Sequence, residues 1–176
     1  MNNINIEEVA RRFADGCHAD QRYGDQPYMT HIDDVVFILK KWGEKTSFPG
    51  FAVNQCIIAG YLHDTIEDTT ATPDMIAALF DNEVAGIVMR VTDAEGSNRK
   101  ERKLRSYPKM AEDVRAVAVK VADRLANVRA CKETDKKAML KLYQSEHKEF
   151  MQQLIIDTGF REILEPMITE LEKEIE

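Results

Sequence analysis

The sequence predicts an all-α protein that folds as a single domain. Its length of 176 residues is that expected of one domain. Apolar residues recur at three- and four-residue spacing along most of the chain, which is the period of a helix. The eight glycines and five prolines fall singly, and no repeat or proline-rich linker divides the chain. We therefore expect one helical domain over residues 1–176, with C-terminal helices in 134–176 packing on the rest.

Three helices are predicted in the N-terminal half. Thr30 has the side chain of an N-cap and would start the second helix, with His31 in its first turn. Thr72 and Pro73 form a cap and first turn that would start the third. The apolar positions that mark these helices are Val9, Phe13 and Cys17 in the first, Val35, Ile38, Leu39 and Trp42 in the second, and Met75, Ile76, Leu79 and Phe80 in the third.

The segment 59–70, AGYLHDTIEDTT, is an apolar helix that runs into several ionisable residues. At about 100° per residue these side chains fall within an arc of roughly 140°, so one cleft can contain all of them. Carboxylates at a helix C-terminus oppose the helix dipole unless a cation, such as a bound metal, compensates them. Gly60 on the same side would let another element approach closely. The ionisable residues are His63, Asp64, Glu67 and Asp68.

The segment 114–130 has valines that alternate between 117 and 121 as in a strand, but its length and wider spacing favour a helix. This helix is apolar on two sides, so it is expected to be sandwiched between others. Asp123 and Asn127 fall inside one of the apolar stripes. A buried carboxylate must be protonated, paired or bound to a metal, so Asp123 is either a metal ligand or the partner of an arginine from another helix.

Helices are expected to continue to the end of the chain. From Arg161 onward, apolar residues lie on one side and glutamates elsewhere, which is typical of an amphipathic helix on the surface. Tyr143 falls at helical spacing with Leu140 and Phe150, and this spacing favours a place in the core. Apolar positions on these last helices can serve the core or a second copy of the chain, so a homo-oligomer stays open.

Composition excludes several classes of protein. The net charge of −7 argues against binding nucleic acid as the main activity. The longest apolar run, at 56–62, is far too short to cross a membrane. The three cysteines are scattered and odd in number, which favours a reducing compartment, so we expect a cytoplasmic protein.

A mixed site of nitrogen and oxygen ligands is predicted from distant parts of the chain. A histidine near a helix start, such as His31, is uninformative by itself. Together with His63, Asp64 and Asp123 it makes two imidazoles and two carboxylates, a set suited to manganese, iron, magnesium or zinc. Coordination positions would remain for water and substrate.

The segment 99–109, RKERKLRSYPK, reverses the acidic character of the chain. A solvated helix face is the ordinary explanation of such a run. In an acidic protein the same strip can also concentrate polyphosphate at a nearby cleft. The sequence leaves both readings open.

These motifs resemble those of the HD-domain metal-dependent phosphohydrolases. The lone His, the His-Asp pair and the distant Asp of that family are matched by His31, His63-Asp64 and Asp123. The stretches RYGDQPYMTH, LHDTIEDT, VAGIVMRVTD and VKVADRLANV resemble the hydrolase domain of RelA/SpoT-type alarmone enzymes, and the length is similar to that of small alarmone hydrolases. The resemblance covers a motif core at about 5–150.

The resemblance implies a single-domain HD-domain fold and an enzyme of the stringent response. Its substrate would be the purine nucleotide ppGpp, hydrolysed at the 3′-pyrophosphate with release of pyrophosphate. The usual metal of the family is manganese, and four histidines in the whole chain favour one ion over two. The residues that the resemblance assigns are Glu67 and Asp68 for hydrolysis, Arg22 and Asn127 for the nucleotide, and Lys100 and Arg105 for its phosphates.

Two positions depart from the pattern of the family. Tyr23 stands where a lysine is common, which removes a charge that faces phosphate, and Ile32 stands where a proline is common. Two alternatives to ppGpp hydrolysis are therefore kept. One is a phosphatase acting on NADPH or another nucleotide at the same metal site, and the other is a non-catalytic nucleotide sensor.

Overall fold

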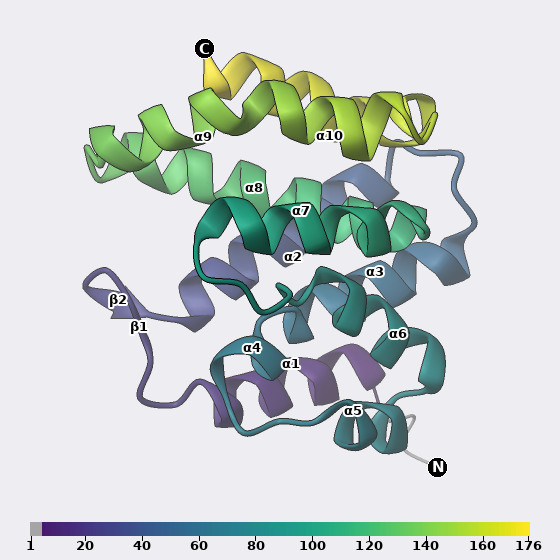
Figure 1. Ribbon diagram of the computed structural model, residues 1–176. Helices are drawn as coiled ribbons and strands as arrows, with labels where there is room; N and C mark the ends of the chain where they lie inside the picture. Colours follow the sequence, from purple (N-terminus) through teal and green to yellow (C-terminus); the bar gives the residue numbers. More distant parts are fainter. Residues whose placement is uncertain (1–4) are drawn as a thin grey trace.

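The computed structural model describes residues 5–176 and confirms the all-α class (Figure 1). The elements are α1 (Ile6–Cys17), β1 (Arg22–Tyr23), β2 (Gln26–Pro27), α2 (Met29–Gly43), α3 (Gly50–Leu62), α4 (Thr65–Asp68), α5 (Pro73–Leu79), α6 (Asn82–Val91), α7 (Arg99–Ala111), α8 (Val114–Glu133), α9 (Lys137–Met151), the π-helix η1 (Gln152–Ile156) and α10 (Arg161–Ile175). Within the described range, no helix is both long enough and apolar enough to span a bilayer.

Two buried helices, α3 and α8, lie at the centre of the molecule and contact each other and α2. On one side, α1 and α6 pack on α3 (Figure 1). On the other side, α7, α9 and α10 pack on α8. Burial on both sides of α8 confirms the predicted sandwiched helix, because Val117 and Val121 are as fully buried as Ala116 and Val119. The residues that α8 carries to the pocket therefore stand on a backbone held by packing on both sides.

Of the two N-caps predicted from the sequence, the one at Thr72 forms and the one at Thr30 does not. The Thr72 hydroxyl accepts a hydrogen bond from the Met75 amide at 3.3 Å, which confirms the predicted start of α5. The prediction that Thr30 caps α2 is wrong. The carbonyl of Tyr28 already accepts the amides of His31 and Ile32, so Thr30 lies inside the helix.

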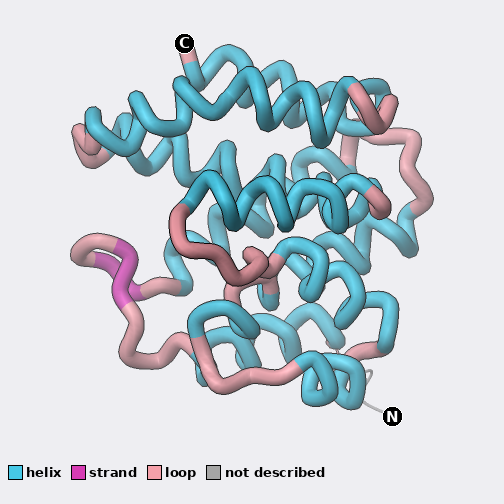
Figure 2. Tube along the Cα trace, in the orientation of Figure 1, coloured by secondary structure: helices cyan, strands magenta, loops and turns pink. Residues whose placement is uncertain are grey.

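A two-stranded hairpin at residues 22–27 departs from the all-α prediction (Figure 2). Arg22 pairs with Pro27, and Tyr23 pairs with Gln26. Gly24 has φ of +62°, the left-handed conformation that glycine adopts without strain. Two-residue strands are too short for a period-2 pattern, so only the Gly24-Asp25 turn signalled the hairpin.

Candidate metal centre

The chain breaks its helix at the predicted metal ligands. The expectation of one helix through 59–70 is wrong, because α3 ends at Leu62 and α4 starts only at Thr65. The Thr65 hydroxyl donates to the Leu62 carbonyl at 2.7 Å, which satisfies a group that the ended helix leaves free. His63 Nδ1 donates to the Gly60 carbonyl at 2.8 Å. Nε2 of His63 is thereby left as the ring nitrogen that can bind a metal.

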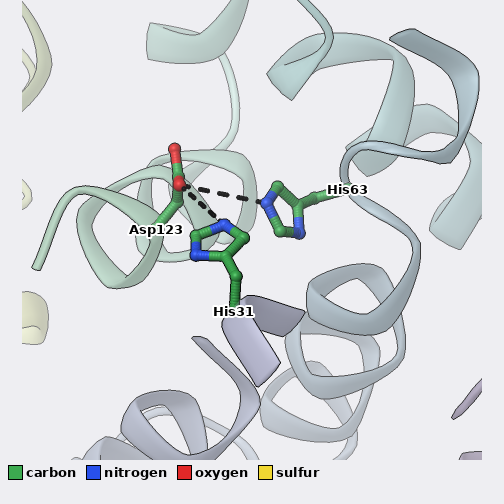
Figure 3. A group of neighbouring side chains, drawn as sticks. All are labelled: His31, His63 and Asp123. Atoms are coloured by element: carbon green, nitrogen blue, oxygen red, sulfur yellow. Dashed lines mark ion pairs between the residues drawn. The ribbon is translucent and has the colours of Figure 1, made fainter. Parts of the chain in front are cut away.

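His31 of α2, His63 of the turn after α3 and Asp123 of α8 converge, and their side chains point toward one another (Figure 3). One potential ligand atom from each lies within 4.8 Å of the others. Asp123 Oδ1 is 3.4 Å from His31 Nε2 and 3.9 Å from His63 Nε2. All three residues are buried.

Asp64 completes the set of four residues that the sequence selected. Its Oδ2 atom lies 3.1 Å from His63 Nε2 and 3.9 Å from His31 Nε2. The Tyr28 hydroxyl donates to the same oxygen at 2.5 Å, which fixes the carboxylate next to the two imidazoles. Tyr28 was not among the residues that the sequence singled out.

The four side chains fit a divalent metal. Atoms bound to one ion at about 2.1 Å lie roughly 3–4 Å from one another, and the separations here are 3.1–3.9 Å. His63 Nε2 is buried and makes no hydrogen bond to any described residue. A buried nitrogen without a partner is costly unless something binds it. Neutral imidazoles with carboxylates are a donor set for manganese, iron or zinc.

Electrostatics favour a cation at this place. Burial favours the neutral forms of Asp64 and Asp123, but His63 lowers the pKa of Asp64 and Lys120 lowers that of Asp123. Burial also opposes protonation of His63, yet the Asp64 carboxylate outweighs it and raises the pKa of His63 to about 9. The cluster therefore attracts a proton, which a metal ion has to displace on binding.

Asp123 is held from its own helix. Its Oδ2 atom is 3.0 Å from Nζ of Lys120, so the ion pair with an arginine of another helix is not formed. The Asn127 side chain donates to Asp123 Oδ1 at 2.5 Å and accepts from the Tyr23 hydroxyl at 2.8 Å. Tyr23 in turn stacks on the His31 ring, with ring centres 4.9 Å apart. Tyr23, which stands where the resemblance expects a lysine, thus contacts His31 directly and Asp123 through Asn127.

Glu67 and Asp68 lie beside the cluster on α4 and line the same pocket. Glu67 Oε2 accepts the backbone amide of Asp93 at 2.9 Å, and burial raises the pKa of Glu67 above its usual range. Asp68 accepts a hydrogen bond from Gln21 at 2.9 Å, and Gln21 also contacts the buried ring of His18. Each acid has one oxygen fixed and one free of these contacts.

A pocket with a cavity volume of about 200 Å³ opens over these groups and continues into open solvent. Asn127 lines it as predicted by the resemblance. Arg22, Lys100 and Arg105 do not line it and are exposed. Arg22 donates a hydrogen bond to the Asp25 carbonyl, and Arg105 donates one to the Glu95 carbonyl.

Basic and aromatic residues other than Lys100 and Arg105 line the pocket. The pocket wall includes Arg99, Lys103, Lys120, Arg124 and Tyr143. Tyr143 packs against the core, as its spacing predicts, and also lines the pocket. A signal for two of the cations was present in the sequence, because Arg99 and Lys103 stand eight and four residues before the buried Tyr107, on the same helix face.

The family model described as HD domain matches residues 10–150. A probable guanosine-3′,5′-bis(diphosphate) 3′-pyrophosphohydrolase of Synechocystis is 36% identical over 125 residues, 66% of this chain and 15% of that protein. The Drosophila melanogaster guanosine-3′,5′-bis(diphosphate) 3′-pyrophosphohydrolase is 34% identical, with 64% of this chain and 62% of that protein covered. The chain spans less than two thirds of the length of both relatives.

A solved structure shares the fold over nearly the whole chain. It belongs to a metazoan ortholog of SpoT described as hydrolysing ppGpp, and it has a TM-score of 0.74 with 22% identity. The match covers 99% of this chain and 96% of that one. A Listeria monocytogenes protein, lmo0812, matches 85% of this chain with a TM-score of 0.60 and 23% identity.

Proposed function

Because this chain belongs to the HD domain family, we propose that it is a metal-dependent phosphohydrolase that cleaves guanosine 3′,5′-bis(diphosphate) and releases pyrophosphate from the 3′ position. The observation that carries the proposal is the convergence of two histidines and two carboxylates next to a pocket that an acidic pair also lines. Relatives that carry the name of this activity, at 34–36% identity, support the choice of substrate.

His31, His63, Asp64 and Asp123 would hold one divalent ion, for which we propose manganese. When bound, such an ion supplies Lewis acidity, which makes water more acidic and offsets charge that develops on phosphate. Lys120 and Asn127 hold the two oxygens of Asp123, and Tyr28 holds Asp64, so the ligands are fixed before substrate arrives.

Glu67 and Asp68 would manage the protons of the reaction. The raised pKa of Glu67 lets this carboxyl accept or release a proton closer to neutral pH than a glutamate free in solution does. Its Oε2 atom is held by the Asp93 amide, which leaves Oε1 for proton transfer. Asp68 is oriented by Gln21 and lines the pocket next to Glu67.

The experiment incubates the purified protein with ppGpp and Mn²⁺ and measures pyrophosphate and orthophosphate separately. The proposal expects pyrophosphate in equal amount to GDP, and no turnover after chelation. Orthophosphate from ppGpp or from NADPH would instead identify a phosphatase. Nucleotide binding without any metal-dependent turnover would identify a sensor.

A further inference from the structure

A second cluster of charges lies in the pocket wall, apart from the proposed metal ligands. We call Arg99, Lys103 and Arg124 the cationic cluster. Glu146 of α9 lies behind it and does not line the pocket. Arg99 donates to both oxygens of Glu146, at 2.8 and 3.2 Å, and Lys103 donates to Oε2. Arg124 Nη1 is 3.7 Å from the same Oε2.

The cationic cluster holds more positive charge than Glu146 neutralises. Three cations meet one carboxylate, so two positive charges remain on this wall. Arg124 is only 4% exposed, and its Nε atom has no hydrogen-bond partner among the described residues. The ring of Tyr143 lies 5.2 Å and that of Phe150 4.5 Å from its guanidinium carbon. A buried cation with an unpaired N–H favours an acceptor from a ligand.

The two charged parts of the pocket come from different sets of residues and meet on α8, which carries both Asp123 and Arg124. Carboxylates of α4 and the metal ligands face the pocket on one side, whereas the cations come from α7 and from the α8 residue next to Asp123. An anionic group cannot approach the carboxylates without a metal ion, but it can bind the cations directly. The pocket therefore suits a ligand with two separate anionic groups.

We propose that Glu146 sets how tightly the cationic cluster binds the second anionic group of the substrate, a phosphate or diphosphate away from the bond that is cleaved. The assignment of this group to a substrate rests on the proposed function. Glu146 acts as a positioning residue, because it aligns Arg99 and Lys103 from behind and cancels one of their charges. Removing the negative charge of Glu146 should therefore strengthen anion binding. If Glu146 made only a structural contact, its loss would weaken anion binding.

The test titrates inorganic pyrophosphate into the full-length protein by calorimetry, metal-loaded and, in parallel, after chelation. Glu146→Gln keeps the shape of the side chain and, at pH 6, where Lys103 keeps its proton, should bind pyrophosphate about fivefold more tightly, the effect of one added charge at pocket distance. Glu146→Asp keeps the charge and should bind as the wild type does. Lys103→Met should bind about fivefold more weakly. Glu149→Gln removes an exposed acid of the same helix and should change nothing.

Equal or weaker pyrophosphate binding by Glu146→Gln would overturn the proposal, as would wild-type binding by Lys103→Met. If Glu146→Gln does not fold, the other two variants decide. Wild-type affinity of Glu146→Asp together with weakened affinity of Lys103→Met supports the proposal. Any other pair of results overturns it. Because the titration needs no turnover, it stays informative if no nucleotide is hydrolysed.

Where ppGpp is hydrolysed, a second readout compares it with the same nucleotide lacking the 5′-diphosphate. Glu146→Gln should lower KM for ppGpp about fivefold and leave KM for the shorter nucleotide and both kcat values unchanged. An equal change of KM for the two substrates would contradict the assignment of the cluster to the second anionic group.

Discussion

The two charged sides of the pocket bury similar groups but satisfy them differently. On the acidic side, two imidazoles face two carboxylates, and His63 Nε2 finds no hydrogen-bond partner within residues 5–176. On the cationic side, Glu146 gives Arg99 and Lys103 a partner within the protein. The acidic side is therefore incomplete without a cation, whereas the cationic side is largely assembled before any ligand arrives.

This difference indicates how each side contributes to function. Buried charges of one sign are costly, so the acidic side is expected to change most when a metal is added or lost. Cations that a carboxylate already holds in place lose little freedom on binding an anion. Changes on the acidic side should thus affect metal and turnover, and changes on the cationic side should affect affinity alone.

The largest effect is expected for His63→Ala. Loss of this ligand should remove metal binding and lower kcat at least about 1,000-fold. Saturation with Mn²⁺ should raise the melting temperature of the wild type by about 5–10 °C and leave that of His63→Ala unchanged. Elemental analysis and thermal melts check both points. His147→Gln, a histidine outside the site, serves as the control, and an active, metal-replete His63→Ala would refute the ligand assignment.

Glu67→Gln should lower kcat by about 100- to 1,000-fold, because the amide cannot exchange a proton. The metal-induced rise in melting temperature should stay as in the wild type, since Glu67 is not a proposed ligand. Asp74→Asn removes an exposed acid and should leave kcat unchanged. Unchanged turnover of Glu67→Gln would exclude the proton-transfer role.

On the cationic side, affinity for pyrophosphate should fall about fivefold between pH 7 and pH 9. Burial lowers the pKa of Lys103 to about 8, despite Glu146, so this base loses its proton and charge as the pH rises. The groups that face it are Arg99 on α7, Arg124 on α8 and Glu146 on α9. Lys103→Arg keeps its charge over this range, and titrations of this variant should lack the decline. A decline as large as that of the wild type would assign the effect to another group.

The smallest effect is expected for Lys100→Ala and Arg105→Ala. Both side chains are exposed and outside the pocket, so KM should change less than twofold. Steady-state kinetics with ppGpp measures this. A several-fold rise in KM for either variant would show that the exposed basic strip contributes to substrate binding.

Periodicity predicted the fold well where burial follows a regular pattern. The two apolar stripes of 114–130 identified α8 as a central helix, and the same arithmetic set Asp123 beside Asn127, where a hydrogen bond joins them. The cap at Thr72 also formed as predicted, because it needs only local contacts. The predicted convergence of His31, His63 and Asp123 agrees with the cluster in the structure, since those residue types are rarely buried without partners.

Features that depend on contacts distant in sequence were not predictable in the same way. The break between α3 and α4 arises from side-chain bonds of His63 and Thr65 to carbonyls, which no periodicity reports. Which face of 99–109 turns inward is decided by packing of Tyr107 against Phe150 of α9. For that reason the sequence marked the strip as basic but selected Lys100 and Arg105 in place of Arg99 and Lys103.

Gly60 links the spacing of two helices to the centre of the pocket. A Cβ atom at this position would lie 2.6 Å from Cδ1 of the fully buried Leu39, so a side chain there would force Leu39, or the helix α2 that carries it, to move. His31 stands on α2, and the Gly60 carbonyl orients His63. The absence of a Cβ atom at Gly60 thus affects both how closely α2 and α3 approach and where the two imidazoles meet. A substitution at this position would alter the geometry of the site, so we expect few to be tolerated during evolution.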